Sequence, residues 1–149
     1  MNLTKAELRD FLLEKADQYA QRSFVNEDPI LIPHKFSDPK DIEISGLIAA
    51  TLAWGQRKTI ISKSEDIMGR MDNAPWEFVS GACKRDLVRF DGFIHRTFKA
   101  EDITGLVTAL QKLYNDYQSI GSFFSMHIGD ERHLGRSFTA FKKYLLDNG

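Results

Sequence analysis

Apolar side chains recur at helical spacing along most of the chain. The first such stretch follows Thr4-Lys5-Ala6-Glu7, which has the form of a capping box, since the threonine hydroxyl can accept from the third helical amide while the glutamate reaches back. An apolar stripe then continues with charged residues outside it: Leu8, Phe11, Leu12, Ala16 and Tyr19. This pattern predicts an amphipathic helix that ends near Arg22.

Residues 24–37 lack this periodicity. Asp28-Pro29 and Ile32-Pro33 favour extended backbone before each proline, so we expect a loop that is apolar enough to pack down. Asp38-Pro39 then has the form of an N-cap followed by proline at the first helical position. A second helix is predicted from there to about Trp54, with Gly55 as its C-terminal stop.

The second predicted helix is unusually apolar, and we expect it to be the central helix. One face carries larger side chains and another carries small ones that permit close approach by neighbouring helices: Ile44, Leu47, Ile48, Thr51 and Leu52 on the first; Gly46, Ala49, Ala50 and Ala53 on the second. After the short turn Gly55-Gln56-Arg57, apolar spacing resumes from Ile60 to Met71. It predicts a third helix.

The remaining pattern predicts further helices. Short pieces are expected over residues 75–83 and 85–90, an irregular segment over 91–99, a strong helix over 103–117, a helical turn capped by Ser122, and a last helix over 134–145. A chain of 149 residues is the usual size of one domain. We therefore predict one compact all-α globular domain over residues 1–149.

Composition narrows the class of protein. Apolar residues make up 42% of the chain and charged residues 28%, which is typical of a globular protein. No apolar run reaches the roughly 18 residues of a membrane span, and the N-terminus lacks a secretory signal. These features favour a cytoplasmic protein without a membrane partner. Cys83 is the only cysteine, so no internal disulfide or multi-cysteine zinc site can form, and we expect it to be buried or half-buried.

Motifs for catalysis or metal binding are missing from the sequence. None of the four histidines, His34, His95, His127 and His133, has another histidine or a cysteine at the spacing of a helical metal site. The acids Asp38, Asp41 and Glu43 cluster, but a helix N-terminus gathers acids because of its dipole. Neither a phosphate-binding glycine loop nor a nucleophile elbow is present. We therefore predict no metal, cofactor or catalytic residue, and whether the chain is an enzyme stays open.

The charges are distributed unevenly around a net charge of −1. Residues 1–43 carry nine acids against six bases, whereas residues 44–64 carry no acid and hold Arg57, Lys58 and Lys63. Residues 84–99 carry five bases against two acids. The two basic segments can share one face that binds a polyanion, or they can be separate solvated helix faces.

Two segments are candidates for binding. The first is the turn Leu52-Ala53-Trp54-Gly55-Gln56-Arg57-Lys58-Thr59, which carries the ring of Trp54, the amide of Gln56 and the cations of Arg57 and Lys58. These groups lie beside the free backbone amides at the start of the third predicted helix and can contact bases and phosphates. The alternative is that Trp54 belongs to the core and Gln56 to Thr59 cap that helix. In Phe93-Ile94-His95-Arg96-Thr97-Phe98, the polar residues can contact nucleic acid, or the apolar ones can anchor a buried crossing loop.

Three strings together resemble the bacterial family called domain of unknown function 2400. They are Asp28-Pro29-Ile30-Leu31-Ile32-Pro33-His34, Ala49-Ala50-Thr51-Leu52-Ala53-Trp54-Gly55-Gln56-Arg57 and Phe93-Ile94-His95-Arg96-Thr97-Phe98. Members of that family are typically longer than this chain. The resemblance therefore implies that these residues are the N-terminal part of a longer protein.

A shorter match resembles the helix-hairpin-helix DNA glycosylases, in which an apolar helix ends in a glutamine-bearing turn before the next helix, as residues 44–59 do. This resemblance implies a glycosylase-like helical architecture in which Gln56 is the residue that wedges into duplex DNA. Nothing in the chain resembles the Leu-Pro-Gly-Val-Gly hairpin of those enzymes or their catalytic Lys and Asp.

Two functional hypotheses follow. The first is the DNA-binding part of a repair glycosylase-like protein, which contacts double-stranded DNA through Trp54, Gln56, Arg57, Lys58, His95 and Arg96. The second is a helical protein-interaction module without catalysis, in which Trp76-Glu77-Phe78 or Phe123-Phe124 forms the patch for a protein partner or a second copy.

Overall fold

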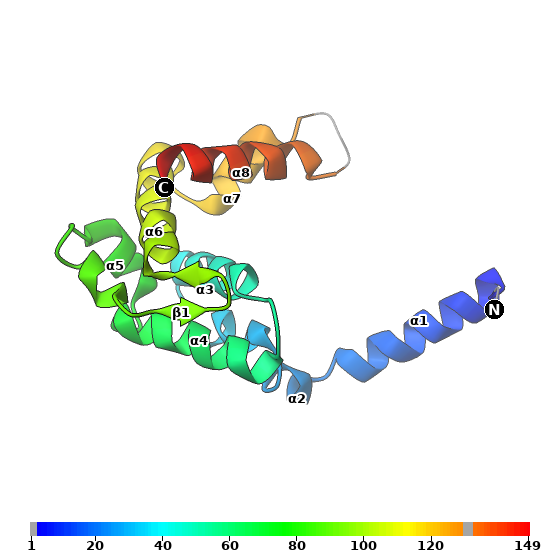
Figure 1. The fold of residues 1–149 in the computed structure, drawn as a ribbon. Helices are drawn as coiled ribbons and strands as arrows, with labels where there is room; N and C mark the ends of the chain where they lie inside the picture. Colours follow the sequence, from blue (N-terminus) through cyan, green and yellow to red (C-terminus); the bar gives the residue numbers. More distant parts are fainter. Residues whose placement is uncertain (1–2, 130–132) are drawn as a thin grey trace.

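A computed structural model describes residues 3–129 and 133–149, and it shows a mostly α-helical protein (Figure 1). The longer helices are α1 (Lys5–Tyr19), α3 (Pro39–Thr51), α4 (Arg57–Arg70), α6 (Ala100–Tyr117) and α8 (Gly135–Asn148). The shorter ones are α2 (Arg22–Val25), α5 (Pro75–Gly81), α7 (Ile120–His127) and the 3-10 helices η1 (Pro29–Leu31), η2 (Pro33–Lys35) and η3 (Leu87–Phe90). Two short strands, β1 (Ile94–His95) and β2 (Phe98–Lys99), form an antiparallel hairpin in the segment expected to be irregular. The predicted all-α class is confirmed.

The helix starts follow the capping residues. Thr4 caps α1 in a complete capping box, in which its hydroxyl accepts from the Glu7 amide at 3.3 Å. Asp38 accepts from the Lys40 amide at 2.8 Å at the start of α3. Two details of the prediction are wrong: α3 ends at Thr51 rather than near Trp54, and α7 is capped by Ser119, whose hydroxyl accepts from the Ser122 amide at 2.9 Å.

Helix α3 lies at the centre of the body, as predicted. It packs against α4, α5, η1 and η2, and its larger face is buried, with Ile44, Ile48 and Leu52 all at 0% exposure. Helix α6 supplies the opposite side of the core and contacts α5, α7 and α8. Residues 24–37, predicted to be a loop, instead contain η1 and η2, and Ile32 before Pro33 is helical rather than extended. The segment packs down as expected, through Ile32, which is fully buried. Among the described residues, no helix has both the length and the apolar character needed to cross a membrane.

The acids of α3 tie other helices to it. Asp41 accepts from the Trp76 amide at 2.8 Å, in the first turn of α5. The Glu43 carboxylate accepts from the Ile120 amide at 2.9 Å and the Gly121 amide at 3.0 Å, and so caps α7. It also accepts from the Tyr114 hydroxyl of α6 at 2.9 Å. These acids therefore do more than complement the dipole of α3, because two of them position α5 and α7.

The Tyr114 phenol is expected to titrate late. Burial and the hydrogen bond to the Glu43 carboxylate raise the pKa of Tyr114 well above its ordinary value, because both disfavour the phenolate. Its contribution to stability is therefore present below the pKa of an unfolded tyrosine, about 10, and is lost as the pH rises toward the folded value. In an absorbance titration of the four tyrosines, we expect Tyr114→Phe to remove the most delayed component, because burial and the hydrogen bond to Asp116 raise the pKa of Tyr144 as well, but less. If Tyr114→Phe instead removes a component that titrates near pH 10, the hydrogen bond does not form.

Helix α1 projects away from the body (Figure 1). It has no buried residue, and its predicted apolar stripe is exposed, with Leu8 at 45%, Phe11 at 48% and Leu12 at 56%. The helix that the pattern predicted is confirmed. Apart from Tyr19, whose ring centre lies 5.3 Å from that of Phe24 in α2, its stripe is not covered by the described part of the chain, because α1 continues outward from α2 instead of turning back onto the core.

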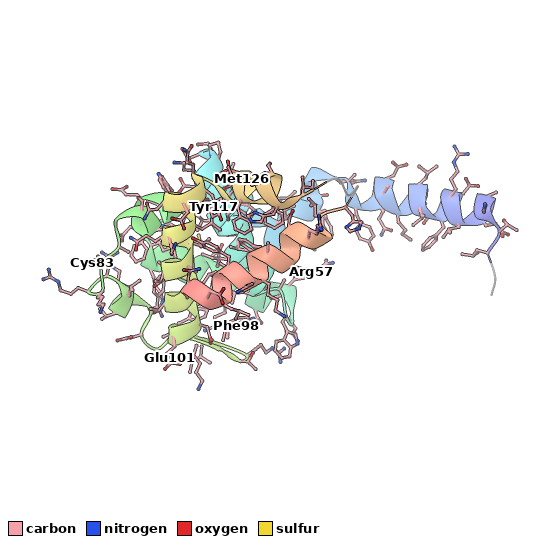
Figure 2. The ribbon with its side chains drawn as sticks, turned by 90° about the horizontal axis from the view of Figure 1, so that it is seen from above. Arg57, Cys83, Phe98, Glu101, Tyr117 and Met126 are labelled. Carbon is pink, nitrogen blue, oxygen red and sulfur yellow. The ribbon has the colours of Figure 1, made fainter. Side chains whose placement is uncertain are left out.

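The expected burial of Cys83 is wrong. Its thiol is exposed, because Cys83 lies in the loop after α5, where its amide donates to the Asp86 carboxylate at 2.8 Å. Cys83 and Arg57 lie at opposite sides of the body (Figure 2).

Candidate nucleic-acid interface

The turn between α3 and α4 presents its side chains to solvent. Trp54 is 57% exposed, so the alternative that it belongs to the core is wrong. Gln56 occupies the N-cap position of α4, but its side chain makes no capping bond there. Arg57 and Lys58 follow in the first turn of α4 and are exposed. The ring, the amide and both cations of the turn are therefore all available to a ligand.

The β1–β2 hairpin is anchored on this turn. Phe93 is buried at 1% exposure and His95 at 3%. His95 Nε2 lies 3.1 Å from the Leu52 carbonyl oxygen, and because a carbonyl only accepts, Nε2 is the donor. The anchored-loop interpretation therefore holds for Phe93 and His95. His95 cannot contact a ligand from this position, and its role is to hold the hairpin against the turn.

Arg96 lies at the tip of the hairpin and reaches the turn. Its backbone has a φ of 57°, in the left-handed region that disfavours side chains. Gly55 makes room for its guanidinium, since a Cβ added to Gly55 would lie 2.8 Å from Arg96 Nη2. Two segments about 40 residues apart in sequence thus converge. We call the exposed set Trp54, Gln56, Arg57, Lys58 and Arg96 the turn–hairpin surface.

Two side chains, Asp28 and Phe24, lie close to Arg57 of this surface. Arg57 Nε lies 3.8 Å from Asp28 Oδ2, and its guanidinium lies 5.3 Å from the ring centre of Phe24. Lys63, one helical turn beyond the surface, lies 5.6 Å from the ring centre of Phe93. Asp28 is the acid that pairs with Arg57. Residues 44–64, which carry Arg57 and Lys58, contain no aspartate or glutamate themselves. Sequence reasoning did not assign Asp28 to the site; its only signal was its place in the first family-like string.

The geometry suits anion and ring binding. Backbone amides at the start of a helix attract anions, here without a competing side-chain cap. Arginine and lysine bind phosphate oxygens, and an exposed indole ring can stack on a base. Within residues 3–129 and 133–149, no group of three or more histidines, cysteines, aspartates or glutamates could hold a metal ion.

The interaction patches expected from the sequence are not surface patches. Trp76 and Phe78 are half-buried and pack against the core. Phe123 is 1% exposed, and Phe124 packs beside it, with the ring centres 6.2 Å apart. These aromatic residues lie on the inner faces of α5 and α7, so they stabilise the fold rather than offer a docking site.

Comparison with known proteins gives one match. The model of a protein family described as "Protein of unknown function (DUF2400)" matches residues 28–149. No curated protein and no solved structure matches the chain. The match starts within the loop after α2 and covers both segments that form the turn–hairpin surface.

Proposed function

Since the chain belongs to the DUF2400 family, whose description assigns no activity, we propose from the geometry that it binds DNA through the turn–hairpin surface. The observation that carries this proposal is the convergence of Arg96 with the turn that bears Arg57 and Lys58. Phosphates repeat along a nucleic acid, and several cations on one surface can contact several of them at once.

The exposure of Trp54 favours nucleic acid over a small anion. A free phosphate would need only the cations and the helix amides. A Trp side chain held 57% exposed beside those cations adds a flat apolar ring, which stacks on bases or inserts between them. The glycosylase-like role of Gln56 as a wedge is part of this proposal, and its free amide supports it.

The backbone of Arg96 adds a second argument. Holding a residue other than glycine in the left-handed region costs about 1–2 kcal/mol. Residues held in such conformations occur at binding sites more often than elsewhere. Glycine would fit the φ of 57° at this tip more easily. An arginine there is best explained by what its side chain contacts.

Binding to duplex DNA should depend steeply on salt. In fluorescence anisotropy, we expect Arg57→Ala/Lys58→Ala to weaken binding at least ten-fold and to reduce the slope of log K against log salt by about 2, at ~0.9 per lost phosphate contact. Arg96→Gly should weaken binding without lowering the melting temperature, because relief of about 1 kcal/mol of strain offsets the entropy cost of glycine, about 0.5–1 kcal/mol.

The matched control is Lys84→Ala/Arg85→Ala, which removes two adjacent cations near Cys83, on the side of the body away from Arg57 (Figure 2). This variant should bind like the unchanged protein. Equal losses in both double variants would mean that binding is diffuse and would contradict the proposed surface. Absence of binding at low salt would overturn DNA binding itself.

A second candidate function is protein association through α1, because its exposed apolar stripe is typical of a helix that packs against another surface. The same DNA titration separates the two functions. Deleting residues 1–21 should leave DNA affinity unchanged, since no residue of the turn–hairpin surface lies on α1.

A further inference from the structure

A groove opens directly beside the turn–hairpin surface, between η1 and α3. Its volume is about 530 Å³, within the range of small-ligand sites, ~300–1,000 Å³. Gly55 and Arg57 of the turn both line it. The groove and the cation cluster are therefore continuous, and one ligand can occupy both.

The groove exists because the facing side chains are small. Ala49, Ala50 and Ala53 line the α3 wall, and Pro29 and Ile30 line the η1 wall. The small side chains on this face of α3 were expected to let a neighbouring helix approach closely. The space beside Ala50, which is exposed, is open instead. An apolar slot of this kind accepts a flat ring more readily than a hydrated charged group.

The groove contains one carboxylate with spare acceptor capacity. Asp28 Oδ1 accepts from the Ile30 amide at 3.0 Å and so caps η1. Oδ2 lies 3.8 Å from Arg57 Nε, which is too far for a hydrogen bond. Since each carboxylate oxygen has two lone pairs, Oδ2 can accept from a ligand. The side chain of Asp28 is 24% exposed, so that ligand can reach it.

We propose that this groove receives an unstacked base of single-stranded DNA that carries an amino group, with Asp28 Oδ2 accepting a hydrogen bond from that group. This inference rests on the proposed function. The neighbouring phosphates then contact Arg57, Lys58 and Arg96, and the next base stacks on Trp54. Charge complementarity argues for this occupant, because the groove is lined mainly by apolar residues and also by Arg57 and Gly55, and the Arg96 guanidinium lies beside Gly55. A base within a duplex is stacked and paired and cannot enter such a slot.

The test compares oligo-dC with oligo-dT of equal length. Aspartate accepts from the N4 amino group of cytosine, whereas thymine offers O4, an acceptor, in that place. We expect the unchanged protein to bind oligo-dC about ten-fold more tightly. Asp28→Asn is the matched variant, because its side-chain oxygen can still cap η1 while an NH₂ donor replaces Oδ2. It should lose the cytosine preference or reverse it toward oligo-dT.

A second variant tests the groove without touching a charge. Ala50→Leu places a larger side chain in the slot, on an exposed helical position where leucine is well tolerated. It should weaken binding of both oligonucleotides several-fold, leave duplex binding unchanged, and melt like the unchanged protein.

The outcomes separate this inference from the proposed function. Equal affinities for oligo-dC and oligo-dT in the unchanged protein, or unaltered binding by Ala50→Leu, would overturn the groove as the base site. If duplex DNA still bound with a salt dependence that Arg57→Ala/Lys58→Ala reduces, the proposed function would stand. Failure to bind either form of DNA would overturn both.

Discussion

Glu43→Ala is expected to lower the free energy of unfolding by about 3 kcal/mol. Its carboxylate accepts from the Ile120 amide, the Gly121 amide and the Tyr114 hydroxyl. Alanine would leave all three donors without this partner, and hydrogen bonds to a charged group contribute more than neutral ones. Because Tyr114 is 5% exposed, water cannot easily replace the lost acceptor. The melting temperature should fall by roughly 6–12 °C, at ~2–4 °C per kcal/mol for a chain of this size.

Two controls isolate the capping role of Glu43. Glu65→Ala removes an exposed carboxylate that pairs with the surface residue Lys35, and it should change stability by less than about 1 kcal/mol. Glu43→Gln keeps an acceptor oxygen, so its free energy of unfolding should lie between those of Glu43→Ala and Glu65→Ala. If Glu43→Ala and Glu65→Ala melt alike, the contacts from α3 to α6 and α7 do not stabilise the fold in solution.

His95→Ala is expected to destabilise the protein by about 2–4 kcal/mol and also to weaken DNA binding. The imidazole is 3% exposed and donates to the Leu52 carbonyl. Its loss leaves a cavity and removes one of the two hydrogen bonds to the Leu52 carbonyl, which also accepts from the Trp54 amide. It also frees the hairpin that holds Arg96 beside Gly55. Chemical denaturation measures the first effect, and anisotropy under folding conditions measures the second.

His95→Gln separates positioning from mere packing, because a glutamine amide can donate to the same carbonyl. It should recover most of the stability and most of the DNA affinity. An alanine variant that loses stability but binds DNA normally would contradict the link between the hairpin anchor and the placement of Arg96.

The helices could be predicted from local signals because those signals lie within a few residues. The Thr4 capping box, the Asp38-Pro39 start and the spacing from Ile60 to Met71 each involve contacts inside one helix. The β1–β2 hairpin was missed because each strand has two residues. A strand that short shows no alternation of apolar and polar side chains.

The candidate surface was predicted in part. Trp54, Gln56, Arg57, Lys58 and Arg96 converge and are exposed, but no local pattern distinguishes His95, which points inward, from Arg96, which points outward. The caps that Asp41 and Glu43 supply were also hidden, since their partner amides lie about 35 and 77 residues away. Sequence periodicity shows which face of a helix is apolar but not what covers it. The exposed stripe of α1 illustrates this limit.

Helix α1 contributes no buried residue, so local unfolding of this helix exposes no side chain of the hydrophobic core. Helices shorter than about 12–15 residues are marginal in water without tertiary contacts, and α1 has 15. Its backbone amides are therefore expected to exchange with solvent through local fraying, whereas those of α3 and α6 exchange only when the core opens. The chain thus has two separate unfolding equilibria, and a single melting temperature describes only the one that belongs to the core.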